Sequence, residues 1–249
     1  MSLTQLMEGL FGWKILAEAK ESNAMVVKRR NEKILLSHNV IYSKLRDGSL
    51  YTHSYWDYFI PLPSLYSRPR ILIIGLGGGT IPYQINRLFG PSAEIDIVEL
   101  DRNMLRLVDA FLPEKLHANI IIEDGYSYVQ RFKGTYDIIM MDPFIRDNIP
   151  DQFFEQRFID GASEALKPDG VLAINYVFSA TGMVRQHEFK SRLGKRFRVY
   201  TVNYSLASGN RIFICSKSMA KEEMIGRIDR NFPKDRENAF ILRAYRKMG

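Results

Sequence analysis

The chain is poor in cysteine and has no long apolar run. Cys215 is the single cysteine among 249 residues, so no disulfide can form within the chain, which is typical of a reducing cytoplasm. Because Cys215 lies in the apolar run Arg-Ile-Phe-Ile-Cys, we expect a buried structural thiol. No apolar run approaches the roughly 20 residues of a membrane span, and the start, Met-Ser-Leu-Thr-Gln, shows no export signal. We therefore expect a cytoplasmic protein without a membrane partner.

Histidine is scarce too, with four in the chain. His53, His117 and His187 have no spacing typical of a metal site, and no Ser/His/Asp arrangement is recognisable, so we expect no metal and no serine-hydrolase chemistry. The net charge of +7 favours anionic partners in general. The bases of 190–198 and 227–247 are mixed with acids or follow helical spacing, however, and aromatic residues do not alternate with them. A nucleic-acid partner is therefore not expected.

The first part of the chain differs in pattern from the rest. Short segments at 13–19, 25–29, 33–36 and 40–45 carry apolar or β-branched residues, and Asn, Gly, Asp and Ser separate them. This pattern predicts a small N-terminal antiparallel β-domain over residues 1–66. Prolines 61, 63 and 69 mark the link into a second domain over residues 67–249.

From Arg70 onward strand and helix patterns alternate, which predicts a parallel sheet with helices on both faces. A further pair of strands, separated by Ala-Ser-Gly-Asn, predicts an antiparallel edge hairpin. Gly170 reads as a helix stop. The expected fold is α/β, a Rossmann-like seven-stranded methyltransferase-type sheet. The expected strands are 70–75, 94–100, 119–123, 136–141, 171–176, 198–204 and 211–216, and the expected helices are 80–89, 102–111, 126–132 and 153–166.

The end of the first of these strands is the most informative feature. Four glycines, Gly75, Gly77, Gly78 and Gly79, follow an apolar run and precede a helical pattern, and the next strand ends at Glu99. Glycines allow a sharp strand-to-helix turn and close approach of a ligand, and a carboxylate at the next strand tip can bind a ribose diol. We therefore expect an adenosine-bearing cofactor here, with Leu100 as part of its site.

Polar residues also follow the third, fourth and fifth strands, at the edge where ligands bind in such sheets. Asp124 and Gly125 follow the third strand, where a carboxylate can accept a hydrogen bond from an adenine amino group. Asp142 follows the fourth and faces the ligand crevice. Other roles remain open: Glu99 or Asp101 can cap the following helix, Asp124 can hold a turn, and Asp142 can start one.

Taken together, these motifs resemble the spermidine synthases, the polyamine aminopropyltransferases. The resemblance rests on Ile-Ile-Gly-x-Gly-x-Gly, Val-Glu-Leu-Asp, Glu-Asp-Gly, Tyr-Asp-Ile-Ile-x-x-Asp and Ala-Leu-Lys-Pro-Asp-Gly in that order, and it covers roughly residues 33–216. It implies a homodimer or homotetramer and decarboxylated S-adenosylmethionine as cofactor, leaving as methylthioadenosine. By position it implies that Glu99 binds the ribose, Asp124 binds the adenine and Asp142 helps to deprotonate the attacking amine.

The departures from this family fall on the amine-binding half. Gly78 stands where the family's glycine loop has an aspartate, and Ile145 stands where its gate has a second acid, with Asp147 out of register. Tyr42 replaces a glutamine. The family's Tyr-His-Glu falls on Tyr51-Thr52-His53, which keeps only Tyr51. The resemblance therefore implies a retained adenosine half and a rewritten amine half, so activity on putrescine is doubtful.

We interpret the chain as a transferase that moves an aminopropyl or related alkyl group to a small-molecule amine. Asp142 accepts the amine proton, and Tyr51, Tyr176 and Phe144 wall the site. Methyl transfer from S-adenosylmethionine is the alternative, because Gly78 leaves room for a carboxylate and Asp142-Pro143-Phe144 partly matches an amino-methyltransferase gate. A non-catalytic nucleoside-binding module is a further alternative. A nicotinamide dehydrogenase is disfavoured, since Glu-Asp-Gly and Asp142 have no role in it.

Overall fold

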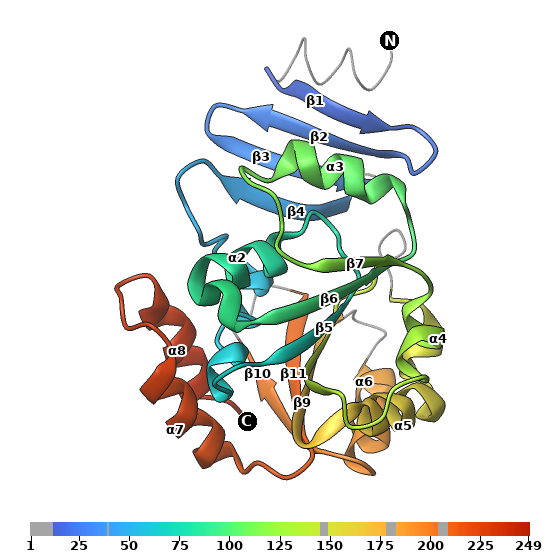
Figure 1. Ribbon diagram of the computed structural model, residues 1–249, viewed down its shortest axis with the longest axis vertical. Helices are drawn as coiled ribbons and strands as arrows, with labels where there is room; N and C mark the ends of the chain where they lie inside the picture. The colour runs from blue at the N-terminus through green and yellow to red at the C-terminus, as the bar shows by residue number, and fades with distance from the viewer. Residues whose placement is uncertain (1–11, 39, 145–148, 178–182, 204–208) are drawn as a thin grey trace.

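The structure is a computed structural model, and it describes residues 12–38, 40–144, 149–177, 183–203 and 209–249. It contains two sheets, a small one near the N-terminus and a large one through the middle of the molecule (Figure 1). The small sheet is antiparallel with the order β1-β2-β3-β4, which confirms the sequence prediction. Its strands are β1 (Lys14–Ala19), β2 (Ala24–Arg29), β3 (Glu32–Ser37) and β4 (Val40–Arg46).

The large sheet has seven strands in the order β10-β11-β9-β8-β5-β6-β7. Five neighbouring strands are parallel, and β11 runs antiparallel to both β9 and β10, which confirms the predicted edge hairpin. The strand order reverses at β5, whose neighbours are β8 and β6, so a crevice is expected at its carboxyl end. The strands are β5 (Arg70–Ile74), β6 (Glu94–Glu99), β7 (Asn119–Ile122), β8 (Tyr136–Met141), β9 (Leu166–Val177), β10 (Arg198–Val202) and β11 (Asn210–Ser216).

Helices cover both faces of the large sheet (Figure 1). Alternate residues of β5 enter different cores: Ile71 and Ile73 pack toward α2, α3, α7 and α8, whereas Leu72 and Ile74 pack toward α4, α5 and α6. None of the described helices is both long and apolar enough to cross a membrane. The α-helices are α2 (Thr80–Phe89), α3 (Asn103–Phe111), α4 (Gly125–Val129), α5 (Gln156–Ala165), α6 (Met183–Gly194), α7 (Lys221–Asn231) and α8 (Asn238–Arg246). Short 3₁₀ turns are η1 (Tyr55–Tyr58), η2 (Leu62–Leu65), η3 (Gly90–Ser92) and η4 (Asp151–Phe154).

Several predicted boundaries are wrong. Gly170 does not end a helix: α5 ends at Ala165, and β9 runs from Leu166 through the Lys-Pro-Asp-Gly segment. This early start is held by pairing of Leu166 with Tyr136 and by the Lys167 ammonium, 2.8 Å from the Asp137 carboxylate. Helix α5 also begins three residues later than predicted, after the turn η4, and α4 ends at Val129. Helices α6, α7 and α8 were not among the predicted elements.

The small sheet packs against helix α3 of the large sheet's layer (Figure 1). The Lys33 ammonium donates to the carbonyls of Ala110 and Phe111 at 3.5 and 3.0 Å, at the C-terminal end of α3. The Arg106 guanidinium donates to the Glu18 carbonyl at 2.8 Å. One apolar core contains residues from both sheets. The boundary between residues 66 and 67 therefore stays a prediction from the sequence.

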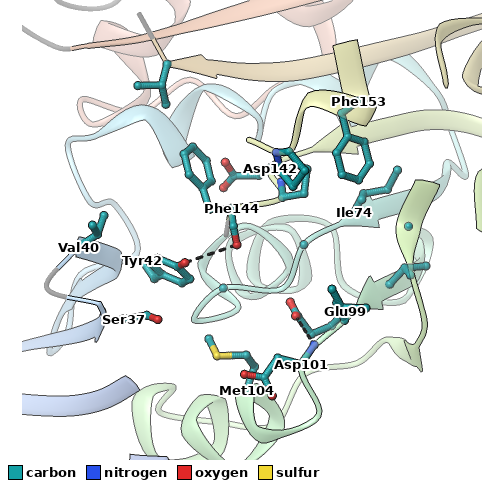
Figure 2. A pocket seen from close by; sticks show the side chains of 18 of the residues that line it. Ser37, Val40, Tyr42, Ile74, Glu99, Asp101, Met104, Asp142, Phe144 and Phe153 are labelled. Carbon is teal, nitrogen blue, oxygen red and sulfur yellow. Dashed lines mark hydrogen bonds between the residues drawn. The ribbon is translucent and has the colours of Figure 1, made fainter. Parts of the chain in front are cut away.

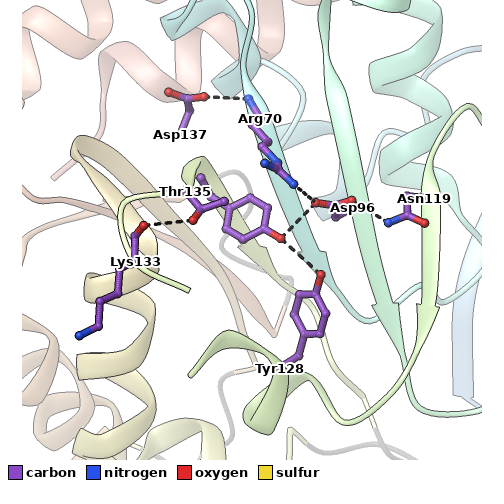
Figure 3. A network of polar contacts seen from close by, with 8 residues as sticks. Arg70, Asp96, Asn119, Tyr128, Lys133, Thr135 and Asp137 are labelled. Carbon is purple, nitrogen blue, oxygen red and sulfur yellow. Dashed lines mark hydrogen bonds and ion pairs between the residues drawn. The ribbon is translucent and has the colours of Figure 1, made fainter. Parts of the chain in front are cut away.

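A polar network ties the strands together at their amino ends (Figure 3). The Asp96 carboxylate accepts hydrogen bonds from the Tyr136 hydroxyl at 3.1 Å, the Asn119 amide at 3.0 Å and the Arg70 guanidinium at 3.3 Å. The Tyr128 hydroxyl of α4 lies 3.5 Å from that of Tyr136. These bonds join β5, β6, β7, β8 and α4, and they fix the strands whose opposite ends carry the predicted site.

Candidate active site

A cavity of about 440 Å³ lies at the carboxyl ends of β5, β6, β7 and β8, and the small sheet forms its other wall. Figure 2 shows Asp142 and Phe144 on one side of it, Glu99 and Asp101 on another, and Tyr42 on the small-sheet wall. Its volume is within the usual range for a small-molecule site. The predicted site residues that line it are Gly75, Gly77, Glu99, Leu100, Asp124, Gly125 and Asp142.

Gly75 allows the crevice to form. Its φ is +93°, and a Cβ there would lie 2.5 Å from the Asp142 carbonyl oxygen. Only glycine therefore lets β5 turn away while the end of β8 passes so close. The Gly75 N–H donates to the Val98 carbonyl at 2.9 Å, and the Asp142 N–H donates to the Ile74 carbonyl at 2.9 Å.

Gly78 and Gly79 do not line the cavity. Gly79 is the left-handed residue that precedes α2, with a φ of +74°. Gly78 packs under β4: its N–H donates to the Ser43 hydroxyl at 2.8 Å, and a Cβ at position 78 would lie 2.4 Å from the Ser43 Cβ. Ser43 is buried and so occupies the space that a side chain at position 78 would need. This packing explains why the loop carries no acid there.

The Glu99 carboxylate is held in place by backbone N–H groups. One oxygen accepts from Leu76 at 2.8 Å, and the other accepts from Asp101 at 2.8 Å. Burial raises the pKa of Glu99 above its usual value, and these hydrogen bonds oppose the shift. Each carboxylate oxygen can accept a further bond, so Glu99 is oriented at the cavity wall and can still bind a diol. It does not cap a helix.

Two other acids of the site accept hydrogen bonds from backbone N–H groups where helices begin. Asp101 accepts from the Asn103 N–H at 2.9 Å at the start of α3. Asp124 is the N-cap of α4, and it accepts from the Tyr126 N–H at 3.2 Å and the Ser127 hydroxyl at 3.0 Å. Both side chains also belong to residues that line the cavity. These backbone hydrogen bonds are therefore compatible with ligand binding at both positions.

Asp142 is an acid of the site whose pKa is strongly raised. Its carboxylate accepts from the Asn175 amide at 2.7 Å and from the Tyr55 hydroxyl at 3.1 Å. Burial raises its pKa to about 7, although these two hydrogen bonds act in the opposite direction. The Asn210 amide donates to Asn175 at 2.9 Å and supports this arrangement. An acid with such a pKa can take up and release a proton near neutral pH.

Tyr51, the other predicted catalytic residue, is not brought to the cavity. It is buried beside Asn238, and burial raises its pKa to about 12. The N–H groups of Thr52 and His53 donate to the buried Asp57 carboxylate, which turns this segment toward η1 and α2. Tyr55, four residues later, lines the cavity and contacts Asp142 instead.

Sequence reasoning missed most of the small-sheet wall, although it placed Tyr42 at an amine-site position. Tyr42 lines the cavity, and its hydroxyl donates to the Phe144 carbonyl at 3.5 Å. The crowding of aromatics between residues 51 and 59 was the one signal that pointed to Tyr55. The cavity residues contributed by the small sheet and its turns are Ser22, Ser37, His38, Val40, Ile41 and Tyr42. Ile145 and Asp147 lie outside the described residues.

The charge of the cavity is opposite to that of the chain. Four carboxylates line it, those of Glu99, Asp101, Asp124 and Asp142, and its described lining contains no Lys or Arg. The chain as a whole carries a net charge of +7. An acidic cavity attracts cations and disfavours anions such as phosphate. Among the described residues, no group of three or more His, Cys, Asp or Glu side chains is placed to hold a metal ion.

Comparisons with known proteins agree with this geometry. The polyamine aminopropyltransferase of Vibrio vulnificus is 31% identical over 150 residues, which cover 58% of this chain and 49% of that protein. The chain spans about half the length, or less, of the curated relatives that it matches.

Two solved structures show the same fold. A spermidine synthase in complex with the transition state analogue AdoDATO has a TM-score of 0.68 at 21% identity, and the likeness covers 89% of this chain and 80% of that one. Human methyltransferase-like protein 13 in complex with SAH has a TM-score of 0.58 at 23% identity, covering 76% and 90%. The family model for the spermine/spermidine synthase domain matches residues 59–208, more than half of the chain. The chain therefore belongs to the spermine/spermidine synthase domain family.

Proposed function

We propose that this protein is a transferase that moves an aminopropyl or related alkyl group from a sulfonium cofactor of the S-adenosylmethionine type to an amine. The observation that carries the proposal is the acid-lined cavity at the reversal of strand order, with Asp142 on one side and Glu99 on the other. Membership of the spermine/spermidine synthase domain family supports it.

The residues present fit such a cofactor. Decarboxylated S-adenosylmethionine carries positive charge on its sulfur and its amine, and the described cavity lining offers carboxylates and no cationic side chain. Glu99, held by two backbone N–H groups, would bind the ribose hydroxyls. Asp124 would accept from the adenine amino group. Methylthioadenosine would be the product that remains after transfer.

The protein's own contribution is alignment and proton acceptance. When bound, the sulfonium supplies an activated carbon, so that a C–N bond to the amine forms as the C–S bond breaks and the electron pair leaves with the sulfur. The Asp142 carboxylate would accept the amine proton, because its pKa is raised to about 7. Tyr55 and Asn175 fix that carboxylate by hydrogen bonds. Alignment of two reactants is worth roughly 7–11 kcal/mol.

Methyl transfer from S-adenosylmethionine is a second candidate, because Gly78 provides no acid for the amino end of a decarboxylated cofactor. Ser43 fills the space beside Gly78, however, so the room that the sequence suggested for a carboxylate is not there. The fold likeness to a human methyltransferase-like protein fits this candidate as well. A non-catalytic nucleoside-binding protein would share the cavity but would not need Asp142.

A thermal-shift panel separates these candidates. The panel compares methylthioadenosine, S-adenosylmethionine, decarboxylated S-adenosylmethionine and NAD. A ligand that binds, present at about 100 times its dissociation constant, stabilises the folded protein by roughly 2.7 kcal/mol. Aminopropyl transfer predicts stabilisation by the decarboxylated cofactor and by methylthioadenosine, with turnover of an amine. Stabilisation by NAD alone would contradict the proposal.

Three finer features belong to the same proposal. A role in polyamine biosynthesis, a cytoplasmic location and assembly as a homodimer or homotetramer follow from the resemblance to spermidine synthases. Size-exclusion chromatography with light scattering measures the assembly state directly, and a monomer at working concentration would contradict that part.

A further inference from the structure

We infer that the acceptor is an amine with a single positive charge and an apolar body, and not a diamine. The inference rests on the proposed transfer to an amine, and it concerns the part of the cavity beyond Asp142. Three features of the described residues carry it: the spacing of the acids along the sheet, the lack of acids beyond Asp142, and the apolar side chains exposed there.

The order of the strands separates Asp142 from the other acids. It follows β8, whereas Glu99 ends β6 and Asp124 follows β7, in the order β8-β5-β6-β7. Neighbouring strands are about 4.8 Å apart, so the end of β8 lies roughly 10 Å from that of β6 and 14 Å from that of β7. Asp142 is therefore the one carboxylate of the described lining on its side of β5.

Beyond β8, the described part of the sheet adds no acid to the cavity lining. Val177 at the end of β9 and Asn210 at the start of β11 are register partners, and both line the cavity. The sequence contains no Asp or Glu from 170 to 187, and none from 189 to 221.

Two arginines lie on this side, and one of them, Arg185, is paired with the Asp151 carboxylate at 3.6 Å. Burial raises the pKa of Tyr176, the residue before Val177, and the two charges that act on it are those of Arg185 and Arg211. Neither Arg185 nor Asp151 lines the cavity. A second ammonium group here would therefore find no carboxylate in the described lining besides Asp142, and burying an unpaired charge is costly.

Exposed apolar side chains gather at the cavity. Four large apolar side chains are exposed among the described residues, and three of them, Ile41, Leu100 and Val177, line the cavity. Ile41 is 48% exposed and Val177 is 36% exposed. Exposed apolar surface that gathers at one site indicates an apolar ligand. Leu100 follows Glu99 and so belongs to the proposed ribose site. The exposed side chains of Ile41 and Val177 are therefore available to contact the acceptor.

Two amines of equal length test this inference. Butylamine and butane-1,4-diamine differ by one ammonium group, and their kcat/KM values are compared with the cofactor that the thermal-shift panel selects. We expect butylamine to have the higher kcat/KM by at least tenfold, which corresponds to about 1.4 kcal/mol. In the Val177→Asp variant a carboxylate faces the same region, so the preference should move at least tenfold toward the diamine.

Leu16→Asp is the matched control, because Leu16 is also 36% exposed but does not line the cavity. It should leave the preference between the two amines unchanged. A wild-type preference for the diamine, or turnover of neither amine while methylthioadenosine still binds, would overturn the inference and leave cofactor binding intact. Loss of methylthioadenosine binding by the wild-type protein would instead contradict the proposed function itself.

Discussion

Asp142 is a partly buried carboxylate, and we expect its ionisation to lower the stability of the fold at neutral pH. Its two hydrogen bonds, from Asn175 and Tyr55, do not offset its burial, so its pKa in the folded protein is raised to about 7. In an unfolded chain the pKa of Asp is about 3.9. The folded state therefore binds the proton more tightly, and its contribution to stability is full in acid and is lost as the pH rises through 7.

Replacement of Asp142 by Asn should therefore raise stability and remove activity together. We expect the variant to unfold at a higher denaturant concentration at pH 8, by up to about 4 kcal/mol, with a smaller gain at pH 5. Turnover should fall about 100-fold or more while methylthioadenosine still binds. Chemical denaturation at both pH values measures the first effect. Asp109→Asn, at an exposed position, is the control, and an equal gain in both variants would refute this explanation.

The same pKa predicts how the rate depends on pH. Since Asp142 accepts a proton only when ionised, kcat/KM should rise with pH through a limb whose apparent pKa is near 7, the value of the ligand-free protein. A kcat/KM that stays constant between pH 5.5 and 8.5 would show that this carboxylate does not act as the base.

Gly78 gives a prediction about packing. In Gly78→Asp the new side chain meets Ser43, so we expect a loss of stability of about 1–3 kcal/mol. The same substitution in a Ser43→Gly background should cost less, because the space is then open. Urea unfolding of the four proteins of this double-mutant cycle measures the coupling. If the cost were equal in both backgrounds, Ser43 would not be what excludes a side chain.

At the scale of elements, the short helix α4 is capped by Asp124, which is also a residue of the proposed ligand site. Asp124 caps it, and α4 is further held through the Tyr128 hydroxyl beside Tyr136 in the polar network of Figure 3. The cap therefore sets where the carboxylate lies at the cavity wall. From the sequence, Asp124 could either hold a turn or contact a ligand. In the structure Asp124 caps α4 and also lines the cavity.

The two roles of Asp124 can be separated by choice of substitution. Serine is a good N-cap without a carboxylate, so Asp124→Ser should keep stability within about 0.5 kcal/mol, whereas Asp124→Ala should lose about 1 kcal/mol. Both variants should bind methylthioadenosine at least tenfold more weakly, as measured by calorimetry. Full binding by the serine variant would limit Asp124 to a structural role.

The elements differ in how well sequence predicts them. The glycine turn, β8 and α2 were predicted with the right bounds or nearly so, because apolar periodicity and glycine positions are local signals. The start of β9 was missed, since it depends on Leu166 pairing with Tyr136 thirty residues away. The sequence does not distinguish Tyr51 from Tyr55. The hydrogen bonds from the N–H groups of residues 52 and 53 to the Asp57 carboxylate decide which of the two tyrosines faces the cavity.

At the scale of the whole molecule, the cavity exists because two sheets meet. Lys33 and Arg106 join the small sheet to α3, and Tyr42 reaches the Phe144 carbonyl across the cavity. The chain has a net charge of +7, but the cavity lining is acidic because acids at the carboxyl ends of several strands lie together there. Composition averages over the chain, so the net charge suggested anionic partners while the site favours a cation.

The central claim is that an adenosyl thioether or sulfonium binds in this cavity with its ribose on Glu99. A crystal structure of the protein grown with methylthioadenosine tests it most directly. We expect the ribose hydroxyls within hydrogen-bond distance of the Glu99 carboxylate, the adenine beside Asp124 and the sulfur toward Asp142. A cavity without the nucleoside, or a nucleoside bound elsewhere on the molecule, would contradict the claim.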